Sequence, residues 1–347
     1  MHFRFNNVND AFNVMVARVS DRKGLIETSS RNGPVLQFPE PVIVTYRYPL
    51  ERVLFNQARD ANPFFHLYEA LWMLAGRNDL APLQYYVSTF DQFSDDGKVL
   101  NGAYGHRWRK SQGDPIHRGR GYVDQLGILI DHLKTKPDSR RAVLQMWNVD
   151  DDLMKIHFSK DVCCNLSAMF MINLGKLDMT VTNRSNDMIL GMFGANLVHF
   201  SILHEYLAAC IGVPVGVYNQ FSNNLHVYTE TYNSAWLEWE RMHHPNLPYE
   251  VPYEQVPLVD QPARFDDECL NFVERHSDNA LAGSYQEPFL RDVAQPMCVA
   301  FHHHKRRDYR SALLAAESIR ADDWRWVAEK WLEKRRDNWL TKTRSEV

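Results

Sequence analysis

Residues 161–228 hold a thiol, a guanidinium, a carboxylate and a carboxamide at positions where they could serve one reaction. Cys164 precedes the strand-like run LSAMFMI, residues 175–176 predict a turn, and Arg184 ends the return run LDMTVTNRS. The resulting hairpin would place the Cys164 thiol close to the Arg184 guanidinium. A neighbouring guanidinium lowers the pKa of a thiol and makes it a better nucleophile. The alternative is an inert buried cysteine, which is the commoner situation for this residue type.

Further polar groups follow the hairpin. Asp187 comes directly after it, and Asn196 lies in the first turn of the helix-like run ANLVHFSILHEYLAACIG. The Asn196 side chain would either recognise a ligand or cap the helix. His226 and Tyr228 lie on the same side of an extended segment, because alternate residues of a strand share a face.

The segments upstream offer a second set of candidates. Residues 1–60, with the runs PVIVTYRYP and RVLF, predict strands and loops, and the turn RNGP at Arg31 could present its guanidinium to a phosphate or leave it in solvent. Asn62-Pro63 predicts the start of the helix FFHLYEALWMLAGRND, whose apolar stripe includes Trp72. Glu69 lies beside that stripe, where a carboxylate is either salt-bridged or used for acid–base catalysis.

Two adjacent arginines come between a predicted helix and a predicted strand. The helix ends near Lys136-Pro137, and Arg140 and Arg141 lead into the strand AVLQMW. Consecutive residues of a strand point to opposite faces, so these two side chains would not serve one ligand within one subunit. One of them could reach across a dimer interface.

The overall composition excludes several classes of protein. The chain has 347 residues, a 45% hydrophobic content and a formal charge of −4, which predict a globular protein of one or two domains without general affinity for nucleic acid. Its five cysteines form neither a disulfide framework nor a zinc motif, so no metal is predicted. No apolar run is long enough to span a membrane, and the N-terminus does not resemble a signal peptide. A cytoplasmic location is expected.

Taken together, these motifs resemble the thymidylate synthase family over residues 25–235. The family's active-site cysteine corresponds to Cys164. The other matching motifs are Arg-Ser-x-Asp at Arg184, Ser185 and Asp187, Glu-x-x-Trp at Glu69 and Trp72, Tyr-Gly-x-x-Trp-Arg at residues 104–109, Asp-Ser-Arg-Arg at residues 138–141, and His-x-Tyr at His226 and Tyr228.

The resemblance implies a three-layer α/β (α+β) fold on a large mixed sheet and a homodimer whose two sites share arginines. It implies 5,10-methylenetetrahydrofolate as co-substrate and dUMP as the favoured substrate. The Cys164 thiolate would add to C6 of the pyrimidine, so that C5 becomes nucleophilic and attacks the one-carbon unit. The other implied roles are phosphate binding by Arg31, Arg184, Ser185 and, from a partner chain, Arg140 and Arg141, proton transfer by Glu69 and Tyr104, ribose binding by His226 and Tyr228, and folate contacts by Asp187 and Trp72.

The choice of base depends on Asn196 in this resemblance. A carboxamide can accept from N3–H and donate to O4 of uracil, whereas cytosine-specific relatives carry a carboxylate at this position. The placement requires one inserted residue in GMFGAN, and without it Ala195 would take the position.

Several departures from the family bear on the last chemical step. The folate-facing tryptophan of the family is Phe90 here, a second nearby tryptophan is Phe93, and the histidine after the nucleophile is Asn165. The final segment LTKTRSEV does not resemble the tail that seals the synthases' site. A less dry site favours water over hydride at the methylene intermediate. We therefore favour 5-hydroxymethyl-dUMP as product, with thymidylate synthesis as the alternative.

The resemblance fades after residue 235, so we expect a core at 1–235 and a divergent extension at 236–347 that packs on it as helices. The run HHHKRR at residues 302–307 predicts a solvated loop. Two other classes of function stay open. They are a cysteine hydrolase that pairs Cys164 with His199 or His226, and a non-catalytic binding protein on a decayed synthase fold.

Overall fold

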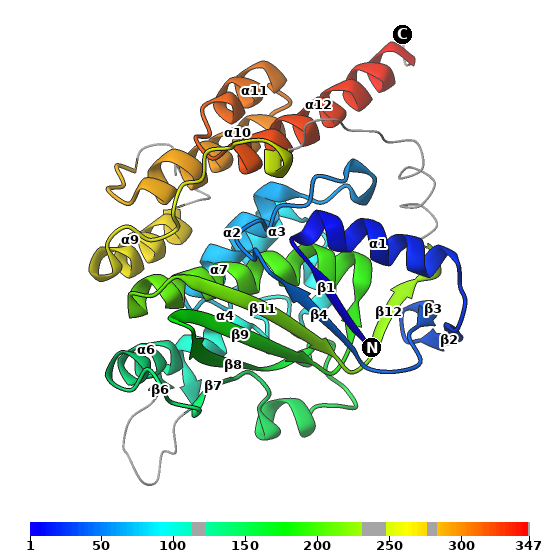
Figure 1. Cartoon of the computed structure of the whole chain (residues 1–347). Coiled ribbons are helices and arrows are strands. Elements are labelled where there is room, and N and C mark those ends of the chain that lie inside the picture. Colours follow the sequence, from blue (N-terminus) through cyan, green and yellow to red (C-terminus); the bar gives the residue numbers. More distant parts are fainter. Residues whose placement is uncertain (113–121, 231–247, 276–282, 346–347) are drawn as a thin grey trace.

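The structure is a computed structural model that describes residues 1–112, 122–230, 248–275 and 283–345, and its centre is a mixed six-stranded sheet (Figure 1). In spatial order the strands are β1 (His2–Phe5), β4 (Val42–Tyr46), β11 (Val215–Ser222), β9 (Lys176–Asn183), β8 (Asn165–Asn173) and β7 (Ala142–Gln145). The pairs β1–β4 and β11–β9 are parallel, and the other neighbours are antiparallel. The antiparallel β8–β9 pair is the hairpin predicted around the Cys164 segment.

Two smaller sheets flank the first. One has the order β10 (Asn186–Asp187), β12 (Leu225–Tyr228), β3 (Gly33–Gln37) and β2 (Ile26–Ser30), and the other pairs β5 (Ser111–Gln112) with β6 (Tyr122–Val123). The β2–β3 hairpin confirms the turn predicted at Arg31. Parallel pairing of β10 with β12 places Asp187 opposite His226, so two distant candidate segments meet here.

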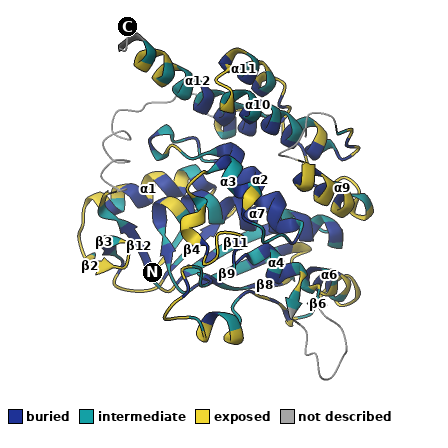
Figure 2. Cartoon of the chain, turned by 180° about the vertical axis from the view of Figure 1, so that it is seen from behind, coloured by how far each residue is buried: buried dark blue, intermediate teal, exposed yellow. Residues whose placement is uncertain are grey.

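One face of the central sheet is covered by a helical layer. This layer contains α1 (Val8–Ser20), α2 (Pro63–Leu74) and α7 (Asn196–Ile211), and Figure 2 shows α7 buried along most of its length. Alternate residues of β9, such as Met179 and Val181, are completely buried against it. Further helices of this part of the chain are α3 (Ala81–Tyr86), α4 (Tyr104–Arg109) and α6 (Gln125–Thr135).

The C-terminal helices form an outer layer on the far side of α2 from the sheet (Figure 1). They are α9 (Pro262–Arg275), α10 (Gln295–Lys305), α11 (Tyr309–Glu317) and α12 (Asp322–Ser345). Phe64 of α2 lies with its ring centroid 5.5 Å from both Phe301 and Trp331, so α2 has neighbours on both sides. All twelve residues of α2 are buried, whereas the sequence predicted a single buried stripe. The expected domain boundary after residue 235 lies outside the described residues.

Two predictions of local structure were wrong. Residues 1–60 contain the helix α1, which buries Val8, Phe12, Met15 and Val19 at helical spacing and is capped by the Asn7 side chain, and no strand forms at RVLF. The run at residues 302–305 belongs to α10 instead of a solvated loop, because a helix turns some of its histidines inward: His304 packs with its ring centroid 4.8 Å from that of Trp331.

Candidate active site

The hairpin brings the Cys164 thiol against the Arg184 guanidinium, as the sequence predicted. Cys164 directly precedes β8 and Arg184 directly follows β9, and the Arg184 backbone N–H donates to the Cys164 carbonyl at 2.9 Å. Nη2 of Arg184 lies 3.5 Å from Sγ of Cys164. The guanidinium also donates to the carbonyls of Val162 at 2.8 Å and Cys163 at 2.7 Å. Arg184 therefore fixes the backbone on which the nucleophile lies.

The pKa of the Cys164 thiol differs from the sequence-based expectation. Burial raises this pKa, and the opposing charges of Arg184 and Arg31 only partly offset the effect. The predicted net lowering is therefore wrong, because the desolvation of the thiolate outweighs the nearby positive charge. Cys163 next to it is still less accessible, at 1% exposure, and burial also raises its pKa.

A cavity of about 470 Å³ opens in front of the thiol. Its walls come from the β2–β3 turn, the segment before β8, the end of β9 and strand β12. Six of the predicted site residues line it: Arg31, Cys164, Arg184, Ser185, His226 and Tyr228. Residues separated by nearly two hundred positions in the chain thus share one polar cavity with two guanidinium groups.

His226 and Tyr228 form the wall opposite the hairpin. Nδ1 of His226 lies 2.8 Å from Oδ1 of Asn224, and burial lowers the pKa of His226. Its imidazole is accordingly neutral near pH 7. The Tyr228 hydroxyl lies 3.4 Å from Nδ2 of Asn32, and the two rings of the wall are perpendicular, with centroids 5.3 Å apart.

Asn165 and Asn196 contribute carboxamide groups next to the nucleophile segment. The Tyr104 hydroxyl accepts from the Asn165 backbone N–H at 3.3 Å, and Asn165 donates through Nδ2 to Oδ1 of Asn196 at 3.3 Å. Asn196 is the first residue of α7, and its side chain does not cap the helix. The capping alternative for Asn196 is therefore wrong: its side chain bonds to Asn165 and Asn186 and does not line the cavity in front of the thiol, and the ligand-recognition alternative stays a prediction.

Glu69 is buried beside His199. Oε2 of Glu69 lies 2.9 Å from Nε2 of His199, and the two residues are 6% and 3% exposed. Neither of these two atoms has a hydrogen bond among the described residues, so the contact is a close approach of the two side chains. His199 faces Glu69, and among the described residues no hydrogen bond joins it to Cys164. This arrangement disfavours the cysteine-hydrolase alternative with His199 as the base.

The comparisons with known proteins agree with this site. Residues 45–264 match the family model described as thymidylate synthase. The chain belongs to the thymidylate synthase family. A protein of Pseudomonas phage M6 named deoxyuridylate hydroxymethyltransferase is 42% identical over 324 residues, which cover 90% of this chain and 88% of that protein. A protein of the same name from Bacillus phage SP01 is 41% identical over 201 residues, which cover 57% of this chain and 52% of that protein.

Asp187 keeps one oxygen without a partner. Its Oδ1 caps the following turn by accepting from the N–H groups of Ile189 at 2.7 Å and Leu190 at 2.9 Å. Its Oδ2 is buried and unpaired among the described residues, and burial raises the pKa of this carboxyl. Arg59, whose Nε donates to the Ile189 carbonyl at 2.6 Å, is a nearby positive charge that sequence reasoning missed.

Eight predicted site residues of this synthase-family chain do not line the cavity. Glu69, Tyr104, Asp187 and Asn196 are described above, and the other four begin with Trp72 and Phe90. Trp72 is 1% exposed and donates from its indole nitrogen to Asp79, so the predicted direct contact with a folate is not supported by its position in the core. Phe90 packs with its ring centroid 5.2 Å from that of Phe65. The other two are the exposed residues Arg140 and Arg141, which precede edge strand β7.

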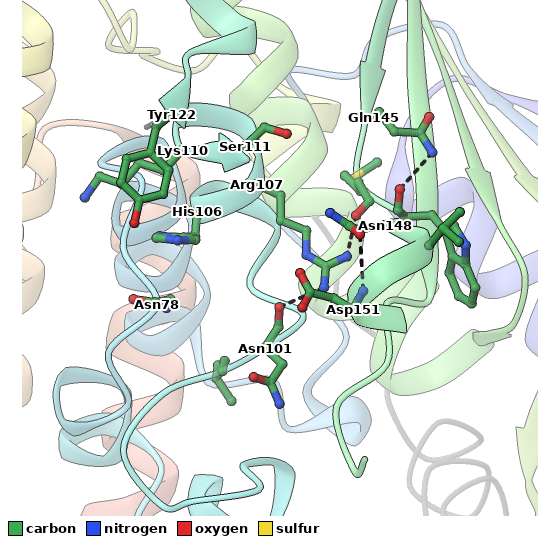
Figure 3. A pocket seen from close by; sticks show the side chains of 14 residues that line it. Asn78, Asn101, His106, Arg107, Lys110, Ser111, Tyr122, Gln145, Asn148 and Asp151 are labelled. Atoms are coloured by element: carbon green, nitrogen blue, oxygen red, sulfur yellow. Dashed lines mark hydrogen bonds between the residues drawn. The ribbon is translucent and has the colours of Figure 1, made fainter. Parts of the chain in front are cut away.

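A second polar cavity of about 420 Å³ lies next to the first, and Trp147 lines both. Figure 3 shows His106, Lys110 and Tyr122 on one side of it and Asn148 and Asp151 on the other. The sequence analysis did not identify this cavity. Its walls combine segments around residues 78, 106 and 148, and their proximity exists only in the folded chain.

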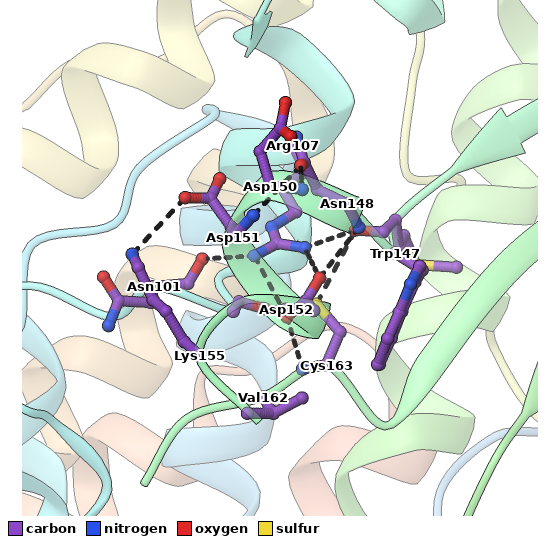
Figure 4. A network of polar contacts seen from close by, with 12 residues as sticks. Asn101, Arg107, Trp147, Asn148, Asp150, Asp151, Asp152, Lys155, Val162 and Cys163 are labelled. Carbon is purple, nitrogen blue, oxygen red and sulfur yellow. Dashed lines mark hydrogen bonds and ion pairs between the residues drawn. The ribbon is translucent and has the colours of Figure 1, made fainter. Parts of the chain in front are cut away.

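A buried ion pair lies under this second cavity and supports the nucleophile segment (Figure 4). Arg107 pairs with Asp152 and also donates to the carbonyls of Met146 at 2.6 Å and Asn101 at 2.9 Å. Asp152 in turn accepts from the backbone N–H of Cys163 at 3.0 Å. The pair therefore holds the residue that precedes the nucleophile. No sequence signal pointed to it, because Asp152 belongs to an acidic run that is typical of a solvated turn.

Two further features are absent from the described part of the chain. No helix there is long and apolar enough to cross a membrane. In the same part of the chain, no three His, Cys, Asp or Glu side chains are grouped closely enough to hold a metal ion.

Proposed function

We propose that this protein transfers a one-carbon unit from 5,10-methylenetetrahydrofolate to C5 of dUMP and releases 5-hydroxymethyl-dUMP. The observation that carries the proposal is the cavity in which the Cys164 thiol, the Arg31 and Arg184 guanidinium groups and the His226–Tyr228 wall face one another. A nucleotide needs an anion site, a hydroxyl site and a base site at fixed spacing. This cavity offers the first two directly beside a nucleophile.

The phosphate would bind between Arg31, Arg184 and Ser185. Charge-assisted hydrogen bonds from guanidinium groups are the strongest that proteins use for phosphate. Since the formal charge of the chain is −4, this attraction is local rather than general. The ribose hydroxyl would contact His226 and Tyr228, where a neutral imidazole can both donate and accept.

Arg140 and Arg141 would complete the phosphate site from a partner subunit. They do not line the cavity of their own chain and are exposed. The uncovered face of the sheet next to them exposes apolar side chains, with Val143 and Met171 both 46% exposed and Met169 39% exposed. Apolar side chains grouped on one open face favour association of two copies through the sheet. We therefore propose a homodimer with shared arginines.

The chemistry at the base would begin with the Cys164 thiolate, which adds to C6 of uracil and leaves C5 nucleophilic. Methylenetetrahydrofolate supplies the carbon at the oxidation level of formaldehyde. After C5 has bonded to this carbon, Tyr104, whose hydroxyl lies beside the nucleophile segment, would assist removal of the C5 proton. Loss of this proton would expel tetrahydrofolate and leave an exocyclic methylene at C5, with Glu69 managing protons at the base through water. Water would then add to the exocyclic methylene at C5, and departure of the thiolate restores the C5=C6 double bond.

Asp187 is the residue that we assign to the folate. Its buried, unpaired Oδ2 is an acceptor that a ring N–H of a pterin could satisfy, and an unsatisfied buried acceptor is costly without such a donor. Phe90 and Phe93 stack edge to face with centroids 5.3 Å apart, and Phe93 is 46% exposed. We propose that these smaller rings leave water access to the methylene carbon. Hydroxymethylation is the activity named for both relatives, which supports this outcome.

The test is a mass-resolved product assay with methylenetetrahydrofolate and either dUMP or dCMP. We expect dUMP to gain a hydroxymethyl group, without a rise in dihydrofolate absorbance. Formation of dTMP and dihydrofolate in equal amounts would instead identify a thymidylate synthase. Absence of any turnover, together with failure of 5-fluoro-dUMP to trap Cys164, would indicate a non-catalytic binding protein.

A further inference from the structure

A continuous relay of carboxamides runs from the end of β9 to β11 past the nucleophile. Nδ2 of Asn183 donates to Oδ1 of Asn165, and Nδ2 of Asn165 donates to Oδ1 of Asn196 at 3.3 Å. Nδ2 of Asn196 donates to Oδ1 of Asn186 at 3.1 Å, and Nδ2 of Asn186 donates to Oγ of Ser222 at 3.2 Å. Every link therefore has the same donor-to-acceptor direction.

The relay is buried except at one member, and the buried Oδ1 of Asn183 at its start has no partner among the described residues. Asn165, Asn183, Asn186 and Ser222 are between 0% and 3% exposed, whereas Asn196 is partly exposed. Buried carboxamides keep their hydrogen bonds because water cannot replace them. The orientation of the Asn196 carboxamide is thus set by its buried neighbours Asn165 and Asn186 and not by solvent.

Because Gly191 has no side chain, Asn196 can lie close to Asn186. A Cβ at this position would lie 2.7 Å from Oδ1 of Asn186 and 3.1 Å from Nδ2 of Asn196. Any larger residue would therefore push the two carboxamides apart.

Within the described parts of the chain, each group of the Asn196 carboxamide makes one hydrogen bond and has one bonding position left. The oxygen can accept a second hydrogen bond, and the nitrogen can donate a second one. With the relay in its present direction, the oxygen lies toward Asn165 and the nitrogen toward Asn186. Uracil offers a donor at N3 and an acceptor at O4, whereas cytosine offers an acceptor at N3 and a donor at N4. If the carboxamide turned over, donor and acceptor would exchange places and the arrangement would match cytosine.

The relay can reverse without losing a bond between Asn196 and Ser222, because a hydroxyl both donates and accepts. Its direction then depends on whether residue 165 offers a donor or an acceptor to Asn196. We propose that Asn165 is a specificity-determining residue, which selects uracil over cytosine by fixing the direction of the Asn165–Asn196–Asn186–Ser222 relay. This inference rests on the proposed function and on a contact of Asn196 with the base, which the family resemblance implies.

Two isosteric substitutions give opposite expectations. Asn165→Asp offers only acceptors, so Asn196 must turn its nitrogen toward residue 165 and the relay reverses. Asn186→Asp also offers only acceptors, but it accepts from Asn196 in the present direction, so the Asn165–Asn196 and Asn196–Asn186 links keep their direction and only the Ser222 hydroxyl turns to become a donor. Each variant introduces one buried carboxylate into the same relay, so Asn186→Asp controls for the charge and for its effect on folding.

The experiment measures kcat/KM for dUMP and dCMP with wild type and both variants. We expect Asn165→Asp to shift the ratio toward dCMP by about 100-fold, since two hydrogen bonds to the base change from matched to mismatched. Asn186→Asp should lower absolute rates without shifting the ratio. Equal ratios in all three proteins, or an equal shift in both variants, would overturn the proposal.

A third variant keeps the test decisive if Asn165→Asp does not fold. Asn165→Ser removes the amide donor without adding charge, so Asn196 can adopt both orientations and discrimination against dCMP should fall by about 10-fold. An unchanged ratio in this variant would overturn the role of Asn165. Failure of the proposed function itself would be recognised separately, because wild type would then turn over neither nucleotide.

Discussion

Removal of the Asp152 carboxylate should loosen the nucleophile segment and destabilise the whole chain. In the folded protein this group accepts hydrogen bonds from the Arg107 guanidinium and from the backbone N–H groups of Asn148 at 2.8 Å and Cys163 at 3.0 Å. The side chains of Asp152 and Arg107 are 1% and 9% exposed, so water cannot replace what is lost. Breaking a buried pair by removing one partner costs about 3–5 kcal/mol, because the remaining charge stays buried and unpaired.

The Asp152→Ala variant should therefore unfold at a clearly lower urea concentration than wild type. Glu27→Ala is the matched control, since Glu27 and Arg22 form an ion pair of 3.2 Å whose side chains are 73% and 53% exposed. That pair should contribute less than about 1 kcal/mol. Covalent trapping of Cys164 by 5-fluoro-dUMP should also slow in Asp152→Ala at temperatures where the variant is folded. A urea midpoint no lower than that of Glu27→Ala would refute the assigned role of the pair, and unaltered trapping would limit that role to stability.

Three other outcomes follow from the site and its surroundings. Cys164→Ser should abolish trapping and turnover, whereas Cys163→Ser should keep most of the turnover, which mass spectrometry of the 5-fluoro-dUMP adduct can compare. Arg184→Met should move the alkylation of Cys164 by iodoacetamide to higher pH, because the guanidinium lowers a pKa that burial raises; a profile like that of wild type would contradict the electrostatic role. Burial raises the pKa of Asp323 from 3.8 to about 6, so its protonated form contributes stability that is complete below pH 3.8 and is lost as the pH rises through about 6. In the Asp323→Asn variant, the urea midpoint should change less with pH between pH 3.8 and about 6 than it does in wild type. An equal change in both proteins would show that Asp323 does not cause this pH dependence.

The sequence was sufficient to predict secondary structure where the pattern of residue types is local. The period-two runs around residues 175–176 predicted the β8–β9 hairpin, and the helix α7 ends at Gly212, whose φ of +89° suits glycine. The cavity residues followed from family motifs that keep their order along the chain. These motifs specify residue types and spacing, and so they assigned Arg184 and His226 to one site without any knowledge of the fold.

Other features depend on partners that are distant in the chain. Complete burial of α2 requires Phe301 and Trp331, which follow it by more than two hundred residues and cover the side of the helix that faces away from the sheet. The helix α1 was missed because its apolar residues follow directly on the strand-like run HFRF. The pKa of Cys164 is the difference between two opposing effects, and the larger of them, burial, cannot be read from neighbouring residues.

The Arg184 side chain explains why one residue can serve both the thiol and the phosphate. Its Nε and Nη2 are occupied by the carbonyls of Cys163 and Val162 and by the thiol, and among the described residues no acceptor contacts its Nη1. A planar guanidinium has five donors in a fixed arrangement, so one edge can hold the nucleophile segment while Nη1 stays available to an anion. A lysine side chain has a single nitrogen, which cannot contact the nucleophile segment and the phosphate with separate donor groups as the guanidinium can. Arg184→Lys should consequently weaken nucleotide binding and slow the addition of Cys164 together, although it keeps the positive charge.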